Sequence, residues 1–222
     1  MSTKKIMISW STGKDSAWML HQLQQNSEGE IAGLFCSVNL EFERTAMHAV
    51  RLDLLHRQAR AAGLPLEVVG LPWPCSNAEY ERIMAAFFEK LLSRGITHIA
   101  FGDLFLEDVR AYRCRQLAGS GIEPLFPLWQ HPTGELSRLM LEQGMRAVVT
   151  CIDPRCMPEQ LAGRFYDEAF IASLPEGIDP CGENGEFHTF VFDGPMFRQG
   201  IEIRTGETVH RDGFVFTDVL PA

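Results

Sequence analysis

The sequence predicts an α/β fold, in which helices cover both faces of a parallel sheet, followed by a smaller α+β part. Two observations lead to this prediction. In the first half of the 222-residue chain, short runs of apolar and β-branched residues alternate with helical patterns, as expected for parallel strands joined by crossover helices. In the second half, three β-rich stretches are separated only by turn residues, which is typical of strands that follow one another directly.

The elements of the first half are predicted from the spacing of apolar residues and from stop signals. Gly63 and Pro65 mark the end of one helical pattern, and Gly95 marks the end of another that carries Phe87 and Leu91 on one face. In chain order, the prediction places strands at residues 6–9, 31–38, 66–71, 97–102 and 124–128, and helices at residues 15–25, 46–62, 78–93 and 107–118.

The second half follows a different pattern, with turn sequences such as Asp193-Gly194-Pro195 between its last stretches. An amino-terminal α/β domain is therefore expected at residues 1–131 and an α+β subdomain at residues 132–222. In order, the prediction for this half places a helix at residues 134–143, a strand at 146–152, a helix at 165–173 and β-rich stretches at 185–192, 201–208 and 213–217.

The loop after the first predicted strand has the composition of a phosphate-binding site. A strand that turns sharply into a helix leaves backbone N–H groups free at the positive end of the helix dipole. Gly13 lets the backbone approach a phosphate, and Lys14 adds a positive charge. Ser11 and Ser16 supply hydroxyl donors. Asp15 either holds a hydrated Mg²⁺ ion or caps the helix.

A second polar segment is expected beside this loop. Ligands of parallel sheets lie beyond the carboxyl ends of the strands, and both the loop and Gly102-Asp103 follow predicted strands. Asp103 could contact ribose, metal or substrate, or it could complete a turn. Further along, Arg110, Arg113 and Arg115 form a basic cluster. The first two share a helical face and could bind a phosphate or a carboxylate, or form a solvated surface.

The composition argues against several classes of protein. A formal net charge of −9 argues against nonspecific nucleic-acid binding, which needs a basic surface. The sequence has no run of 18 apolar residues and no apolar region of a signal peptide. Its six cysteines include no Cys-x-x-Cys pair. The chain is therefore expected to be cytoplasmic, with reduced thiols and no membrane partner.

A second signature lies near the carboxyl end of the chain, where two glycines flank Glu183-Asn184 and Glu186 follows. Alone, it is compatible with a glycine-rich hairpin. Together with the loop at residues 11–16, it resembles the diphthine–ammonia ligase family of pyrophosphate-loop ATPases, although Thr12 stands where that loop usually has glycine. Other positions that carry the resemblance are Leu71-Pro72, Ser76-Asn77, Tyr80-Glu81, Gly102-Asp103, Arg113, Arg115, Pro127-Leu128-Trp129 and Asp193-Gly194-Pro195.

This resemblance implies a Rossmann-like sheet of the adenine nucleotide alpha hydrolase-like type, and an ATP-dependent amide ligase. In such an enzyme a substrate carboxylate attacks the α-phosphorus of ATP, pyrophosphate leaves, and ammonia displaces AMP. The family's carboxylate belongs to diphthine, a modified histidine of translation elongation factor 2, and a small carboxylate is the alternative. The implied cofactors are ATP and Mg²⁺. Free ammonium is the expected nitrogen source, because the sequence contains nothing that resembles a glutaminase.

The resemblance also assigns roles to individual residues. Apart from the resemblance, His188 lies two residues beyond Glu186 and on a strand would point to the same face, but it is not assigned a catalytic role. The nucleotide would be bound by Ser11, Thr12, Gly13, Lys14, Asp15 and Ser16, with Asp15 as the metal ligand. The catalytic residues would be Lys14, Asp103, Glu183 and Glu186. The substrate would be bound by Arg113, Arg115, Gly182 and Asn184.

Two other functions remain open from the sequence. One is RNA thiolation, for which Cys151 and Cys156 could form a disulfide relay, although the acidic composition argues against it. The other is non-catalytic binding of ATP or AMP. The sequence also leaves open whether the chain forms a homo-oligomer. A cation–π contact to a quaternary ammonium group is a further hypothesis for Trp73, Tyr80, Phe105 and Trp129.

Overall fold

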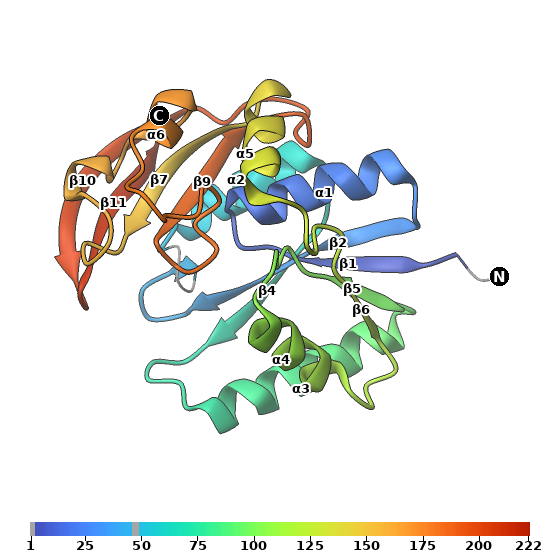
Figure 1. The fold of residues 1–222 in the computed structure, drawn as a ribbon. Coiled ribbons are helices and arrows are strands. Elements are labelled where there is room, and N and C mark those ends of the chain that lie inside the picture. Colours follow the sequence, from blue (N-terminus) through green and yellow to red (C-terminus); the bar gives the residue numbers. More distant parts are fainter. Residues whose placement is uncertain (1–2, 46–48) are drawn as a thin grey trace.

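The computed structural model describes residues 3–45 and 49–222 and shows a parallel sheet in the first half of the chain (Figure 1). The strands run parallel in the order β4-β2-β1-β5-β6. This is the order of a Rossmann-like half, with the switch point between β1 and β5, and it confirms the predicted fold class. The strands are β1 (Lys5–Ser9), β2 (Glu30–Asn39), β4 (Leu66–Leu71), β5 (His98–Ala100) and β6 (Glu123–Leu125), and a short β3 (Arg44–Thr45) pairs antiparallel with β2.

Helices α1 and α2 cover one face of this sheet, and α3 and α4 cover the other (Figure 1). Because successive strand residues point to opposite faces, Ile6 and Ile8 pack in the cluster on the α1 side, whereas Met7 packs with Phe87 and Phe88 of α3. No helix in the described part of the chain has both the length and the apolar composition needed to cross a membrane. The helices are α1 (Lys14–Asn26), α2 (Leu52–Ala62), α3 (Asn77–Ser93) and α4 (Glu107–Leu117).

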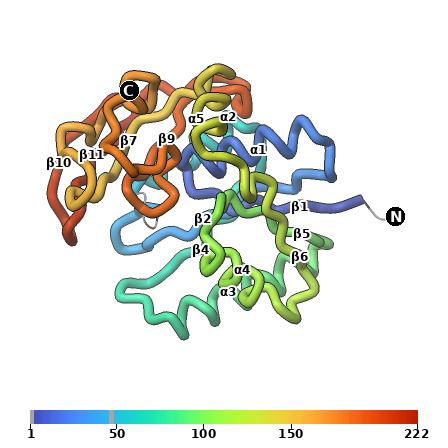
Figure 2. The backbone as a smooth tube through the Cα atoms, in the orientation of Figure 1, coloured from blue at the N-terminus to red at the C-terminus, as the bar shows by residue number. Residues whose placement is uncertain are grey.

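The second half forms an antiparallel sheet that lies against α1 and α2 (Figures 1 and 2). Its central strand, β7, pairs with β8, β9 and β11, and β11 pairs with β10. The elements are α5 (Thr133–Glu142), β7 (Arg146–Ile152), a 3₁₀ turn (Glu159–Leu161), β8 (Phe165–Tyr166), α6 (Glu168–Ala172), β9 (Phe187–Asp193), β10 (Ile203–Arg211) and β11 (Phe214–Pro221).

The two sheets share one hydrophobic core. Helix α1 packs against β9, and α2 packs against β11. A single buried cluster contains Ile8 and Trp18 from the first half together with Val149 and Phe187 from the second. A division of the chain at residues 131 and 132 would therefore cut through a common core, and the two-domain description stays a prediction.

Two predicted helices begin later than the sequence pattern indicates. Helix α2 starts at Leu52, because Ala49 has a left-handed backbone (φ 53°) and Arg51 is extended. The first residues of that predicted helix, 46–48, lie outside the described part of the chain. The helix predicted at residues 165–173 was wrong at its start: the first two residues form β8, and the helix begins only after Asp167, whose Oδ1 accepts a hydrogen bond from the N–H of Phe170 at 2.7 Å.

An ion-pair cluster ties β11 to the chain before α2. Oδ1 of Asp218 accepts a hydrogen bond from Nη1 of Arg44 at 2.9 Å, and Oδ2 accepts one from Nη2 of Arg51 at 2.5 Å. Burial raises the pKa of Asp218, but the hydrogen bonds from the two arginines outweigh this effect and hold the pKa below its usual value. The cluster therefore contributes to stability while the carboxylate is ionised.

We expect Asp218→Asn to lower the free energy of unfolding by about 1–2 kcal/mol at pH 7, because charge-assisted hydrogen bonds are weakened. A carboxyl group with a lowered folded-state pKa stabilises the protein above its unfolded-state pKa and loses this effect as the pH falls through the folded-state value. In urea unfolding, the gap between wild type and variant should therefore shrink below about pH 4. A gap that is independent of pH would contradict this assignment.

Candidate active site

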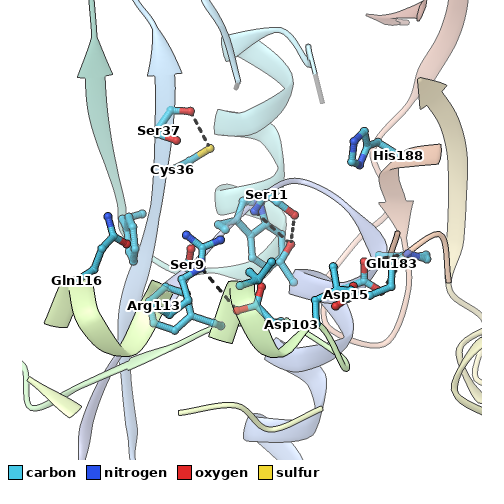
Figure 3. Close-up of a pocket in the computed structure, with 18 of the residues that line it drawn as sticks. Ser9, Ser11, Asp15, Cys36, Ser37, Asp103, Arg113, Gln116, Glu183 and His188 are labelled. Carbon is cyan, nitrogen blue, oxygen red and sulfur yellow. Dashed lines mark hydrogen bonds and ion pairs between the residues drawn. The ribbon is translucent and has the colours of Figure 1, made fainter. Parts of the chain in front are cut away.

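A cavity of about 550 Å³ lies at the carboxyl ends of the parallel strands, at the switch point between β1 and β5 (Figure 3). Ligands of open parallel sheets bind at such points. One wall is formed by the loop between β1 and α1, a second by the residues after β5 together with α4, and a third by the segment that leads into β9. The charged residues of the lining are Lys14, Asp15, Asp103, Arg113 and Glu183.

The loop between β1 and α1 is held in a tight turn by its own hydroxyl groups. Oγ of Ser16 lies 3.1 Å from Oγ of Ser11 and donates to the carbonyl oxygen of Gly13 at 3.0 Å. Thr12 is buried and adopts a left-handed backbone with φ 74°, which is unusual for a β-branched residue. Gly13 occupies the N-cap position of α1, so Asp15, in the first turn, is not the cap.

Neighbouring elements support this strained turn. The carbonyl oxygen of Thr12 accepts hydrogen bonds from Nε2 of Gln58 at 2.9 Å and from the N–H of Val191 at 3.1 Å. The N–H of Lys14 donates to Oγ1 of Thr189 at 3.1 Å. Because strained backbone persists only where its surroundings determine it, α2 and β9 together fix the shape of the loop.

Lys14 and Asp15 form an ion pair at the mouth of the loop. Nζ of Lys14 lies 3.0 Å and 2.8 Å from the two carboxylate oxygens of Asp15, and 5.5 Å from the ring centre of Phe187. Burial alone would lower the pKa of Lys14, but the Asp15 carboxylate raises it. Burial raises the pKa of Asp15, against the effect of the Lys14 charge. The pair therefore fixes the Lys14 ammonium beside the turn, with the Asp15 carboxylate as its counter-charge.

Asp103 and Arg113 face each other across the next part of the cavity (Figure 3), with Nε of Arg113 3.6 Å from Oδ2 of Asp103. Both atoms are buried and lack a hydrogen-bond partner. Burial raises the pKa of Asp103, and the Arg113 charge opposes this. Gly102 allows the segment after β5 to lie close to the start of α1, because a Cβ atom there would lie 3.1 Å from the carbonyl carbon of Asp15. These unsatisfied polar atoms are suited to a polar ligand.

Glu183 reaches the same cavity from the second half of the chain and lies beside Asp15 (Figure 3). Its Oε1 accepts a hydrogen bond from the N–H of Leu104 at 2.7 Å, and its own N–H donates to Oδ2 of Asp179 at 2.8 Å. Burial raises the pKa of Glu183 to about 7, while the backbone hydrogen bonds oppose the shift and the Asp15 charge adds to it. A carboxyl group with this pKa can exchange a proton near neutral pH.

Other predicted residues lie outside this cavity. Glu186 is buried beneath the turn that carries Glu183, and its Oε1 accepts hydrogen bonds from Nδ2 of Asn184 at 2.9 Å and from the N–H of Asp179 at 3.3 Å. These two residues therefore shape the turn. The basic cluster on α4 is divided: Arg110 stacks on Trp129, with its guanidinium 4.6 Å from the ring centre, and Arg115 lines a separate cavity between α3 and α4.

Several lining residues are missed by sequence reasoning. Gln116 follows Arg113 by three positions and therefore shares its helical face, which is the signal that could have identified it. Thr189 lines the cavity from β9, and so does His188, to which the sequence assigns no catalytic role. Gln58 does not line the cavity but supports the loop beside it: it is fully buried on α2, and its Oε1 also accepts a hydrogen bond from Nε1 of Trp10 at 2.8 Å. Its role depends on tertiary contacts that no local pattern reveals.

The carboxylates fit Mg²⁺ only together with phosphate oxygens. Within residues 3–45 and 49–222, no group of three or more His, Cys, Asp or Glu side chains could hold a metal ion. In nucleotide sites, Mg²⁺ usually binds one or two carboxylates together with the phosphates. Asp15 lines the cavity, and Asp103 has an unsatisfied Oδ2 there, so these two residues are suitable ligands.

Comparison with known proteins agrees with this arrangement. Residues 4–119 match the family described as diphthamide synthase N-terminal domain, and residues 133–219 match the diphthamide synthase C-terminal domain. The chain is 29% identical over 180 residues to a diphthine–ammonia ligase of Rattus norvegicus, covering 77% of this chain and 65% of the rat protein. It is 29% identical over 111 residues to the enzyme of the same name from Homo sapiens, covering 48% and 40% of the two chains. The chain therefore spans less than two thirds of these relatives, and it belongs to the diphthamide synthase family.

Proposed function

We propose that this chain is an ATP-dependent ligase that activates a substrate carboxylate as an acyl-adenylate and transfers the acyl group to ammonia. The single observation that carries the proposal is the cavity itself. It brings the turn before α1, with the buried charge of Lys14, together with the Glu183 carboxyl group from the other half of the chain. The family match and the names of the relatives support the same reaction class.

In the proposed first step, the substrate carboxylate oxygen forms a bond to the α-phosphorus of ATP. The bond from that phosphorus to the bridging oxygen breaks, and its electron pair leaves with pyrophosphate. The N–H groups at the start of α1, the hydroxyls of Ser11 and Ser16 and the Lys14 ammonium would hold the leaving phosphates. Mg²⁺, when bound by Asp15 and Asp103, would neutralise phosphate charge. Arg113 would orient the carboxylate.

In the proposed second step, ammonia attacks the acyl carbon, the C–N bond forms, and the C–O bond to AMP breaks. The attacking nitrogen must lose a proton, and the Glu183 carboxylate is suited to accept it. Glu186 and Asn184 would act as positioning residues, because they hold the turn beneath Glu183 rather than facing the cavity.

We expect Glu183→Gln to lower the rate of amide formation about 10²-fold or more, because the proton acceptor is lost. In the wild type, the rate should rise with an apparent pKa near 7, since the carboxyl group must be ionised to accept the proton. Free ammonia also increases with pH, so the informative quantity is the ratio of the wild-type rate to the variant rate at each pH. A ratio that does not change across pH 6–8 would contradict this role.

The reaction itself is tested by incubating the protein with ATP, Mg²⁺, ammonium and candidate acids, including elongation factor 2 carrying diphthine and a panel of small carboxylates. Substrate-dependent formation of AMP and pyrophosphate is the expected result. Formation of ADP and phosphate would reject attack at the α-phosphorus, and nucleotide binding with no product would indicate a non-catalytic binder. Nitrogen transfer from labelled glutamine, but not from labelled ammonium, would refute the proposed nitrogen source.

A further inference from the structure

The ion pair of Lys14 and Asp15 neutralises the positive charge of the loop before α1. Both oxygens of the Asp15 carboxylate contact Nζ of Lys14, at 3.0 Å and 2.8 Å. The two residues are adjacent in the first turn of α1. Adjacent residues of a helix do not face each other, so the helix itself does not impose this contact. A rotation of the Asp15 side chain is therefore enough to separate the two charges.

Burial determines which of the two side chains can change its partner. The Lys14 side chain is 3% exposed, whereas that of Asp15 is 27% exposed. Nζ of Lys14 also lies 5.5 Å from the ring centre of Phe187, so the ammonium is enclosed by protein. Asp15 lines the cavity (Figure 3). In an exchange of partners, Lys14 would therefore stay in place and Asp15 would turn toward the cavity.

The charges around this pair oppose the entry of a bare phosphate chain. The charged lining of the cavity consists of three carboxyl groups and two cationic groups. Burial raises the pKa values of Asp103 and Glu183, and the nearby Asp15 charge adds to both shifts. An anion without a counter-ion would thus meet a carboxylate on Lys14 and two more carboxyl groups beside it. Its binding requires additional positive charge.

We propose that Asp15 is a specificity-determining residue, through which the loop selects phosphate chains that carry a divalent cation over those that do not. The inference rests on the proposed function, because it assumes that phosphates bind at the turn before α1. The Asp15 carboxylate would exchange the Lys14 ammonium for the cation, since hard divalent cations prefer oxygen ligands. The released ammonium would then bind a phosphate oxygen. Asp15 thus disfavours the metal-free chain and favours the metal-bound one.

The test measures the affinity of inorganic tripolyphosphate by titration calorimetry, once with excess MgCl₂ and once with EDTA. The wild type should bind about 10-fold or more tightly with Mg²⁺ than with EDTA. Asp15→Asn keeps the shape of the side chain but not its charge. In EDTA it should bind about 10-fold more tightly than the wild type, because the Lys14 ammonium is released. Equal or weaker binding by Asp15→Asn in EDTA would overturn the proposal.

A double variant separates the release of Lys14 from a simple loss of negative charge. Removal of any carboxylate near the loop weakens the repulsion of an anion. If the gain in EDTA comes from the released ammonium, it should disappear when Lys14→Met/Asp15→Asn is compared with Lys14→Met alone. A gain of the same size without Lys14 would show general repulsion and would overturn the exchange.

Two further variants complete the test. Asp53 also lies in the first turn of a helix and pairs with a cation, Nε of Arg57 at 3.1 Å, but its side chain is 55% exposed and lies on α2 outside the lining of the cavity. Asp53→Asn is therefore the matched control and should keep the wild-type affinities with Mg²⁺ and with EDTA. Asp15→Ala replaces Asp15→Asn if that variant does not fold, and the same gain in EDTA is expected.

Two outcomes separate the inference from the proposed function. Wild-type binding of tripolyphosphate that is equally tight with Mg²⁺ and with EDTA would overturn the selection by Asp15 and leave the phosphate site intact. A wild-type protein that binds neither tripolyphosphate nor ATP in the presence of Mg²⁺ would overturn the proposed function and, with it, the role of Asp15.

Discussion

Replacing Lys14 with methionine should lower the rate of ATP-dependent pyrophosphate release about 10²- to 10³-fold, as the loss of one preorganised charge does in other active sites. The Lys14 ammonium is 3% exposed and is held on both oxygens of Asp15. It is thus a buried positive charge beside the turn that would hold the leaving phosphates. Methionine fills a similar volume, so the effect should come from the missing charge. Stopped-flow or coupled pyrophosphate assays measure it directly.

The matched control is Lys90→Met. Lys90 is also paired with a carboxylate, Glu67 at 2.8 Å, but its side chain is 57% exposed and lies on α3 away from the cavity. This variant should keep the wild-type rate and lose at most a few tenths of a kcal/mol of stability. If Lys14→Met retained most of its activity while folding normally, the turn before α1 would not be the site of pyrophosphate release.

Replacing Gly182 with alanine should be the most destabilising single change in the site, by about 2–5 kcal/mol. Gly182 has a left-handed backbone with φ 66°, where a side chain adds strain. A Cβ atom there would also lie 2.9 Å from both a ring carbon and the carbonyl oxygen of Phe187. Because the Phe187 ring packs near Lys14, the clash would disturb Glu183 and the Lys14 pair together. Urea unfolding and the rate of amide formation should both reveal the change.

Gly185→Ala separates the effect of backbone strain from the effect of the contact with Phe187. Gly185 also has a left-handed backbone, with φ 86°, but a Cβ atom there would meet no atom within 4 Å. This variant should therefore lose only the backbone term, about 1–2 kcal/mol. Equal losses for the two variants would show that the contact with Phe187 contributes nothing.

Much of the fold could be predicted because the signals are local. The strand at Leu66–Leu71 and the strand at Arg146–Ile152 appear where apolar patterns and turn residues place them. The starts of α2 and α6 could not be placed by periodicity alone. At α2 the backbone turns through Ala49 into an extended Arg51, and at α6 strand pairing with β7 holds the first predicted residues. In both cases tertiary context overrides helical spacing.

The candidate site was predictable where residues follow strand ends and less so elsewhere. The carboxyl ends of parallel strands meet at one edge, which is why Lys14 and Asp103 line one cavity. Glu183 could be placed there only by resemblance, since 79 positions separate it from Leu104, whose N–H it accepts. Glu186, three residues later, points under the turn instead. The spacing of carboxylates along a glycine-rich loop does not determine which of them faces a ligand.

The support of the Thr12 turn by Gln58 and Val191 has a consequence for engineering. A hybrid protein that joined the amino-terminal half of this chain to a foreign carboxyl-terminal half would replace the Val191 N–H and the Thr189 hydroxyl that hold the turn. The hybrid could keep every residue of the loop at residues 11–16 and still lose nucleotide affinity. The two halves of this chain are therefore not interchangeable modules, and successful chimeras would have to transfer α2 and β9 together.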